Sequence, residues 1–163
     1  MRVLAVYYSL EGNCREVAGA IAGATGGAAE ALRPEREIAA RGWWRFVAGG
    51  VRAMWGRPGP NQPLAADPSR FGLVFVGTPV WAWRMSPPVR RFLSETAWNG
   101  QKVALFALHG GAPGRTLRAM RGLVEARGGR VASEAAFLDL RRGDADETRR
   151  RAAEWAARTA GAP

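Results

Sequence analysis

The alternation of continuous apolar runs with helical stretches limits this chain to few folds. Apart from Arg2 and Lys102, residues 1–8, 72–77 and 102–108 are uncharged, largely apolar runs rich in β-branched or aromatic side chains. Each run has strand length and ends at a turn that contains glycine. Residues 13–24 and 116–126 have the character of helices between such strands. Uninterrupted apolar strands that alternate with helices predict a parallel sheet covered on both faces.

Weaker elements complete the pattern. They are a strand within residues 28–38, a helix over 43–55, a loop over 56–68, a helix over 87–94, a strand over 130–138 and a helix over 144–159. The last helix has acidic residues at its positive end, which stabilises its dipole. The sequence therefore predicts one α/β domain over residues 1–160, a three-layer, doubly wound, five-stranded parallel sheet.

Ligands of a doubly wound sheet bind beyond the carboxyl ends of the strands, where the winding reverses. The loop after the first strand runs from Ser9 to Arg15 and leads directly into a helix. Backbone N–H groups at such a helix start, with small hydroxyl and amide side chains, favour an oxyanion. An ordinary strand–helix turn capped by Asn13 is the alternative.

Three loops resemble those of flavodoxin-like proteins, over a region from Arg2 to about Ala157. Ser9, Gly12 and Asn13 match the family's phosphate loop, whereas Glu11 and Cys14 stand where threonine is usual. Residues 77–88 resemble the Gly-Thr-Pro-x-Trp segment of the family and its following Pro-Pro helix. Residues 107–114 resemble its glycine-rich third loop.

The resemblance implies a flavodoxin-like fold with FMN as the cofactor. With one cysteine and one histidine in the chain we expect no Cys/His zinc site, and no catalytic side chain is evident. The residues that it implies for FMN fall into a phosphate loop, a ring-contacting loop and a glycine loop: Ser9, Leu10, Glu11, Gly12, Asn13 and Cys14; Thr78, Pro79, Val80 and Trp81; His109, Gly110 and Gly111. Flavin contact and ordinary packing are equal alternatives for Trp83. The third loop has no aromatic residue, so we expect an exposed flavin or another cover.

Two departures from the family pattern bear on FMN. A carboxylate at Glu11 would repel the phosphate if it pointed inward, so we predict an outward orientation, with Arg15 as an offsetting cation. We predict that Cys14 acts as a small residue that contributes its N–H, and a redox thiol is the alternative. His109 is expected to form hydrogen bonds, with proton relay as the alternative.

The net charge of +10 bears on partners. It predicts an acidic docking surface on any redox partner protein, and a small electron donor or acceptor is the alternative. The basic residues are scattered without an aromatic–basic pattern, so we expect no specific nucleic-acid binding. One cysteine and the lack of a visible secretory signal favour a cytoplasmic setting.

The segment 43–55 is unusually rich in tryptophan. Ordinary packing on the sheet is the first interpretation for it. A homodimer contact or a lid over the flavin is the second, and membrane-surface contact is the least favoured.

Three functions remain open from the sequence. The first is an FMN-dependent electron carrier, which needs no catalytic side chain. The second is an FMN oxidoreductase linked to NAD(P)H or a quinone. The third is an interaction protein that has kept the fold and lost the cofactor, for which Glu11 is the reason.

Overall fold

A computed structural model describes residues 1–35 and 59–161 of the chain, so the predicted helix over 43–55 lies outside the described residues. In chain order the elements are β1 (Val3–Tyr7), α1 (Asn13–Thr25), β2 (Ala28–Ala31), a 3₁₀ turn (Pro68–Arg70), β3 (Leu73–Trp81), β4 (Arg84–Met85), α4 (Pro87–Glu95), β5 (Lys102–His109), α5 (Thr116–Ala126), β6 (Arg130–Leu138) and α6 (Ala145–Ala160).

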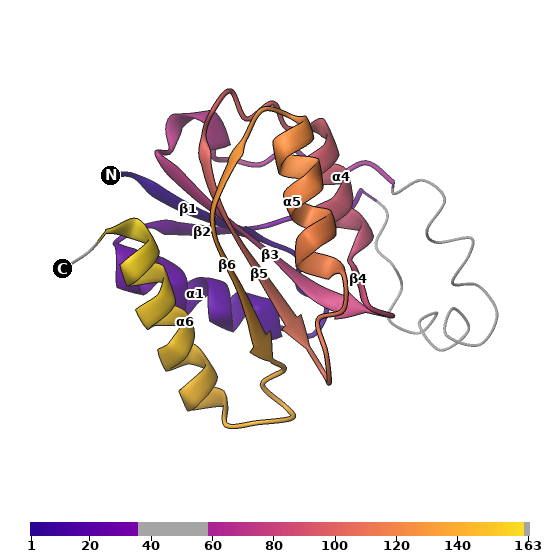
Figure 1. Cartoon of the computed structure of the whole chain (residues 1–163), viewed down its shortest axis with the longest axis vertical. Coiled ribbons are helices and arrows are strands. Elements are labelled where there is room, and N and C mark those ends of the chain that lie inside the picture. The colour runs from indigo at the N-terminus through magenta and orange to yellow at the C-terminus, as the bar shows by residue number, and fades with distance from the viewer. Residues whose placement is uncertain (36–58, 162–163) are drawn as a thin grey trace.

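In the part of the chain that the structure describes, five strands form one parallel sheet in the order β2-β1-β3-β5-β6. Helices α1 and α6 cover one face of the sheet, and α4 and α5 cover the other (Figure 1). The predicted three-layer, doubly wound sheet is confirmed. The strand order reverses between β1 and β3, so the loops after these two strands leave the sheet at the same place.

The two faces of the sheet carry separate hydrophobic clusters, because successive strand residues point to opposite sides. Val3 and Ala5 of β1 face α1 and α6, whereas Leu4 and Val6 face α4 and α5. All four are buried. Burial on both faces explains why the sequences of these strands are almost continuously apolar.

Helix α6 anchors the first face through Trp155. Its indole lies edge-on to the rings of Phe75, Phe106 and Phe137, with centroid separations of 5.2, 6.5 and 5.9 Å. Its Nε1 donates a hydrogen bond to Ser133 Oγ over 2.8 Å. Such aromatic contacts add to the stabilisation from burial itself.

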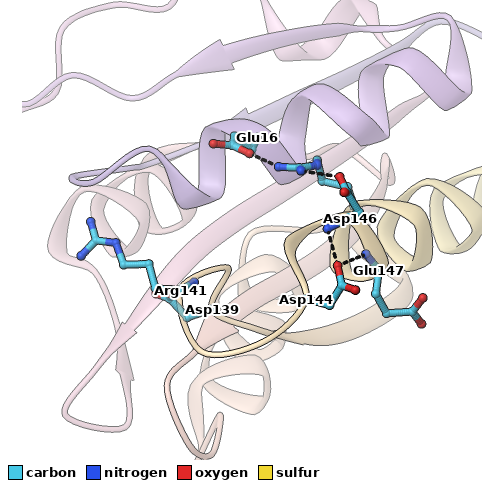
Figure 2. A network of polar contacts seen from close by, with 7 residues as sticks. Glu16, Asp139, Arg141, Asp144, Asp146 and Glu147 are labelled. Carbon is cyan, nitrogen blue, oxygen red and sulfur yellow. Dashed lines mark hydrogen bonds and ion pairs between the residues drawn. The ribbon is translucent and has the colours of Figure 1, made fainter.

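Polar contacts at the start of α6 fix this helix beside α1. Asp144 caps α6, because its carboxylate accepts hydrogen bonds from the backbone N–H groups of Asp146 and Glu147. Arg149 pairs with Glu16 of α1 and with Asp146, so it joins the two helices (Figure 2). The predicted acidic start of this helix is thus a capping arrangement.

The contact between β3 and β5 leaves no room for a side chain at Gly77. A Cβ atom built there would lie 1.9 Å from Cζ of Phe106, whose ring occupies the space over the glycine. Phe106 is fully buried. Gly77 therefore serves packing in the sheet as well as the loop that follows.

Strand β3 continues past the position at which the sequence predicted its end. It extends to Trp81 and pairs antiparallel with β4, where Val80 opposes Met85 and Trp81 opposes Arg84. The turn between them contains Ala82 and Trp83, both with positive φ, at 46° and 61°. The expected loop is thus a tight hairpin, whose turn residues lack the usual glycine or asparagine.

The strand predicted within residues 28–38 is short, since β2 ends at Ala31. None of the helices in the described part of the chain is long and apolar enough to cross a membrane.

Candidate functional site

Loops at the carboxyl ends of four strands surround a cavity of about 750 Å³. It lies at the reversal point of the sheet, where a doubly wound fold is expected to bind its ligand. The cavity is lined by Ser9, Leu10, Glu11, Asn13, Cys14, Pro79, Val80, Trp81, Ala82, Leu108, Gly110, Asp139, Arg141 and Arg142. Nine of these were predicted from the sequence, and all three predicted loops contribute.

The loop after β1 has the geometry of an anion cradle. Gly12 is the N-cap of α1 with φ at +94°, a conformation that costs other residues considerable strain. Ser9 Oγ accepts a hydrogen bond from the Gly12 N–H over 3.0 Å and tightens the turn. Within residues 1–35 and 59–161 no side chain caps α1, so its first N–H groups face the loop without a capping carboxylate or hydroxyl.

Asn13 has a different role from the cap that was the alternative prediction. It is the first helical residue, and its Nδ2 donates to both carboxylate oxygens of Asp139, over 3.0 and 2.9 Å. Asp139 follows β6 and also accepts a hydrogen bond from the Arg141 N–H over 2.9 Å. The amide thus ties the first loop to the loop after β6 instead of capping its own helix.

Glu11 is neutralised by a cation from this fourth loop. Arg141 Nη1 lies 2.9 Å from Glu11 Oε2, with the two side chains 59% and 52% exposed. The sequence pointed to Arg15 as the offsetting cation, whereas the ion pair is formed by Arg141. Arg142 adds a second guanidinium to the cavity lining. Glu11 and Asp139 are therefore balanced in charge by Arg141 and Arg142.

Cys14 is a structural residue in its position and its chemistry. Its side chain is buried in the cluster below α1. Burial raises the pKa of the Cys14 thiol, and the nearby Asp139 carboxylate raises it further. Both effects oppose a thiolate, so the geometry favours the small-residue interpretation over the redox thiol.

We expect Cys14 to be inert toward a thiol reagent in the native protein. With 5,5′-dithiobis(2-nitrobenzoic acid) at pH 8, the native chain should release almost no chromophore, and the unfolded chain should release one equivalent. Because the pKa is raised on folding, the thiol contribution to stability should decline as pH rises above the ordinary thiol pKa of about 8.5. Rapid reaction of the native protein would contradict this assignment.

The hairpin β3–β4 forms the second wall of the cavity. Pro79, Val80 and Trp81 line it, and the Trp81 ring lies edge-on to Tyr8 with centroids 5.7 Å apart. Thr78 does not line the cavity. Its buried Oγ1 accepts a hydrogen bond from the Ser86 N–H over 2.9 Å and donates to Ser86 Oγ or Pro79 O. Thr78 thus holds the base of the hairpin.

The third loop contributes Gly110, while His109 and Gly111 lie outside the cavity lining. The His109 carbonyl accepts a hydrogen bond from the Asp139 N–H over 2.9 Å, which links β5 to the end of β6. Gly12 also lies outside the lining and acts through its backbone conformation. A Cβ at Gly110 would come within 3.0 Å of Arg142 Nε, so the glycine lets this arginine approach.

The structure adds residues that the sequence interpretation missed: Ala82, Leu108, Asp139, Arg141 and Arg142. Three of them belong to the loop after β6. One signal could have found them, because a carboxylate and two arginines directly follow the last strand. In the doubly wound order that strand lies next to β5.

Comparisons with known proteins agree with this architecture. No protein-family model matches the chain, and no curated protein matches it in sequence. Solved structures do match. One is a flavoprotein in complex with FMN from Lactobacillus acidophilus, at 16% identity and a TM-score of 0.67, over 90% of this chain and 97% of that one.

Two further structures match over nearly their whole length. Oxidised flavodoxin 1 from Bacillus cereus is 15% identical, with a TM-score of 0.66 over 99% of this chain and 98% of that one. A WrbA-like flavodoxin from Agrobacterium tumefaciens is 16% identical, with a TM-score of 0.63 over 98% and 95%. The chain therefore has the flavodoxin-like fold.

Proposed function

We propose that this protein binds FMN in the cavity at the β1–β3 reversal point and transfers electrons. One observation carries the proposal. The uncapped start of α1, shaped by the left-handed Gly12, opens beside a cavity that the hairpin wall of Pro79 to Ala82 also lines. A phosphate and a planar ring need such a pair of subsites next to each other.

The residues present fit FMN in size and chemistry. A cavity of about 750 Å³ is within the range that holds small cofactors. The N–H groups at the start of α1 would hold the phosphate, and Trp81 offers an apolar surface to the ring. Glu11 does not prevent this assignment, because Arg141 neutralises it. When bound, FMN would supply a flavin ring that accepts and releases electrons.

The charge of the chain indicates the kind of partner. A net charge of +10 favours an acidic protein surface or an anionic small molecule as the electron donor or acceptor. The association rate should then fall steeply as ionic strength increases.

The decisive experiment is a titration of ligand-free protein with FMN, followed by flavin fluorescence and absorbance. Saturable binding with fluorescence quenching supports the proposal, and Trp81→Ala should weaken both. The control for loss of a tryptophan is Trp83→Ala, since Trp83 lies outside this cavity. Trp98 is not used for this purpose, because it is buried in the core. Absence of binding at tens of micromolar FMN would favour the interaction protein that has lost the cofactor.

The Glu11–Arg141 pair provides a charge test of the same site. We expect Arg141→Gln to weaken FMN binding about 2- to 5-fold, because it leaves Glu11 unpaired near the phosphate subsite, and exposed pairs of this kind contribute up to ~1 kcal/mol. The double variant with Glu11→Gln should recover most of the loss. The wild type, both single variants and the double variant are compared by FMN titration at low salt. Equal FMN affinities in all four proteins would place the phosphate elsewhere.

An FMN oxidoreductase is the second candidate, on one observation. The residues of the third loop from His109 to Gly114 include no aromatic side chain that could cover a flavin ring. An uncovered ring admits a substrate. Anaerobic mixing of the FMN-loaded protein with NADPH separates the candidates, because direct bleaching of the flavin supports a reductase and a stable yellow spectrum supports a carrier.

A further inference from the structure

A second cavity is also lined by residues of the β3–β4 hairpin. It has a volume of about 300 Å³ and is lined by residues of β4, α4 and the start of α5. Two consecutive turn residues line different cavities, since Ala82 lines the first and Trp83 lines the second. Helices α4 and α5 run side by side on this face of the sheet (Figure 1).

The second cavity is strongly cationic. Arg84, Arg90 and Arg115 line it, from three different elements or their flanks, and none of the described residues that line it is acidic. Guanidinium groups in such an arrangement recognise phosphate or carboxylate through paired hydrogen bonds. The lining thus selects an anion.

The start of α5 adds an independent indication. No side chain of the described residues caps this helix, and its positive end lies at the cavity beside Arg115, the N-cap residue. Thr116 lines the cavity and is fully buried, and its Oγ1 has no hydrogen-bond partner among the residues that the structure describes. An unpartnered buried hydroxyl is costly, and a ligand oxygen would satisfy it.

The rest of the cavity is apolar. Met85, Ala119 and Leu123 contribute hydrocarbon surface, and Trp83 contributes an indole that is 68% exposed. A free phosphate ion would leave this surface unused. An aromatic ring stacked on Trp83 would bury it.

We propose that this second cavity binds an aromatic organic phosphate of mononucleotide size. The phosphate would lie at Arg90, Arg115 and the start of α5, and the ring would lie against Trp83. The volume is at the low end for small-molecule sites, so it suits a mononucleotide better than a dinucleotide. The inference concerns a site separate from the proposed FMN cavity and does not rest on the FMN proposal.

The test is calorimetric titration of the protein with AMP, adenosine and inorganic phosphate, before and after loading with one equivalent of FMN and removal of the excess. We expect AMP to bind tighter than either fragment, and its affinity to be the same in the loaded protein. No AMP binding at millimolar concentration would overturn the proposal. So would fragment affinities equal to that of AMP, or loss of AMP binding in the loaded protein, which would place AMP in the first cavity.

Variants locate the site. Arg90→Ala and Arg115→Ala should each weaken AMP binding about tenfold, because the loss of one hydrogen bond to a charged group typically reduces affinity by that factor or more. Arg84 is not substituted in this test, since it has another interaction within the protein. Arg118→Ala is the matched control, because Arg118 lies exposed on α5 outside the cavity lining. Equal affinity for AMP in the control and the other variants would overturn the assignment.

Thr116→Val separates a ligand contact from a structural role. Valine has nearly the same shape, and the Thr116 hydroxyl has no partner to lose. AMP binding should weaken severalfold while the thermal midpoint does not fall, because an unsatisfied hydroxyl is removed. A lower midpoint with unchanged AMP affinity would overturn the role of Thr116 in the site.

Discussion

Gly77→Ala should destabilise the protein by about 3 kcal/mol, at the upper end of the usual cost of overpacking a core. The new methyl group would lie 1.9 Å from the ring of Phe106. That ring is fully buried in the hydrophobic cluster that β5 shares with α1 and α6, so it has little free space to move into. Urea unfolding followed by far-ultraviolet circular dichroism measures the loss as a lower midpoint.

A second glycine substitution controls for the change of residue type. Gly19 is an exposed position of α1, and a Cβ there meets nothing within 4 Å. Gly19→Ala should therefore raise stability by about 1 kcal/mol through helix propensity. A small effect of Gly77→Ala, with the expected gain for Gly19→Ala, would mean that Phe106 can move aside and that the sheet is more loosely packed there.

Gly12→Ala should weaken FMN binding about 5- to 30-fold, which corresponds to the 1–2 kcal/mol that a left-handed conformation costs alanine. Gly12 holds φ at +94° in the turn before α1. An alanine would relax out of that conformation and rotate the neighbouring peptide groups away from the cavity. Binding would then have to restore the strained turn, and the titration with FMN would detect the difference.

Gly26→Ala is the matched control for this effect. Gly26 ends the same helix with φ at +61°, and a Cβ there meets nothing within 4 Å. Gly26→Ala should lower the stability of the protein about as much as Gly12→Ala does, because alanine is placed in a left-handed conformation in both variants. FMN affinity should stay unchanged, since Gly26 lies at the other end of α1. Equal losses of affinity in both variants would indicate general destabilisation in place of a phosphate subsite.

The fold was predictable because its signal is local. Buried parallel strands such as β3 and β5 are continuous apolar runs, and α5 and β6 begin and end where the sequence predicted. The cradle before α1 was also predictable, since Gly12 and the residues around it follow one another in the sequence. Such features depend on backbone propensity and hydrophobic pattern more than on distant contacts.

The missed features depend on distant contacts or on strain. Asp139 pairs with Asn13 across 126 positions of sequence, which no local pattern reveals. The hairpin after β3 was missed because Ala82 and Trp83 occupy left-handed conformations that usually mark asparagine or glycine. Strain of this kind gathers at functional sites, and here the two residues of the strained turn line two cavities.

The position of α6 has a consequence for how the protein is made on the ribosome. Trp155 closes the aromatic cluster of Phe75, Phe106 and Phe137, and Arg149 reaches back to Glu16 of α1. Until α6 has left the exit tunnel, that face of the sheet lacks one of its two helices. The nascent chain therefore exposes part of that apolar face until α6 emerges, and we expect it to need protection by a chaperone during this interval.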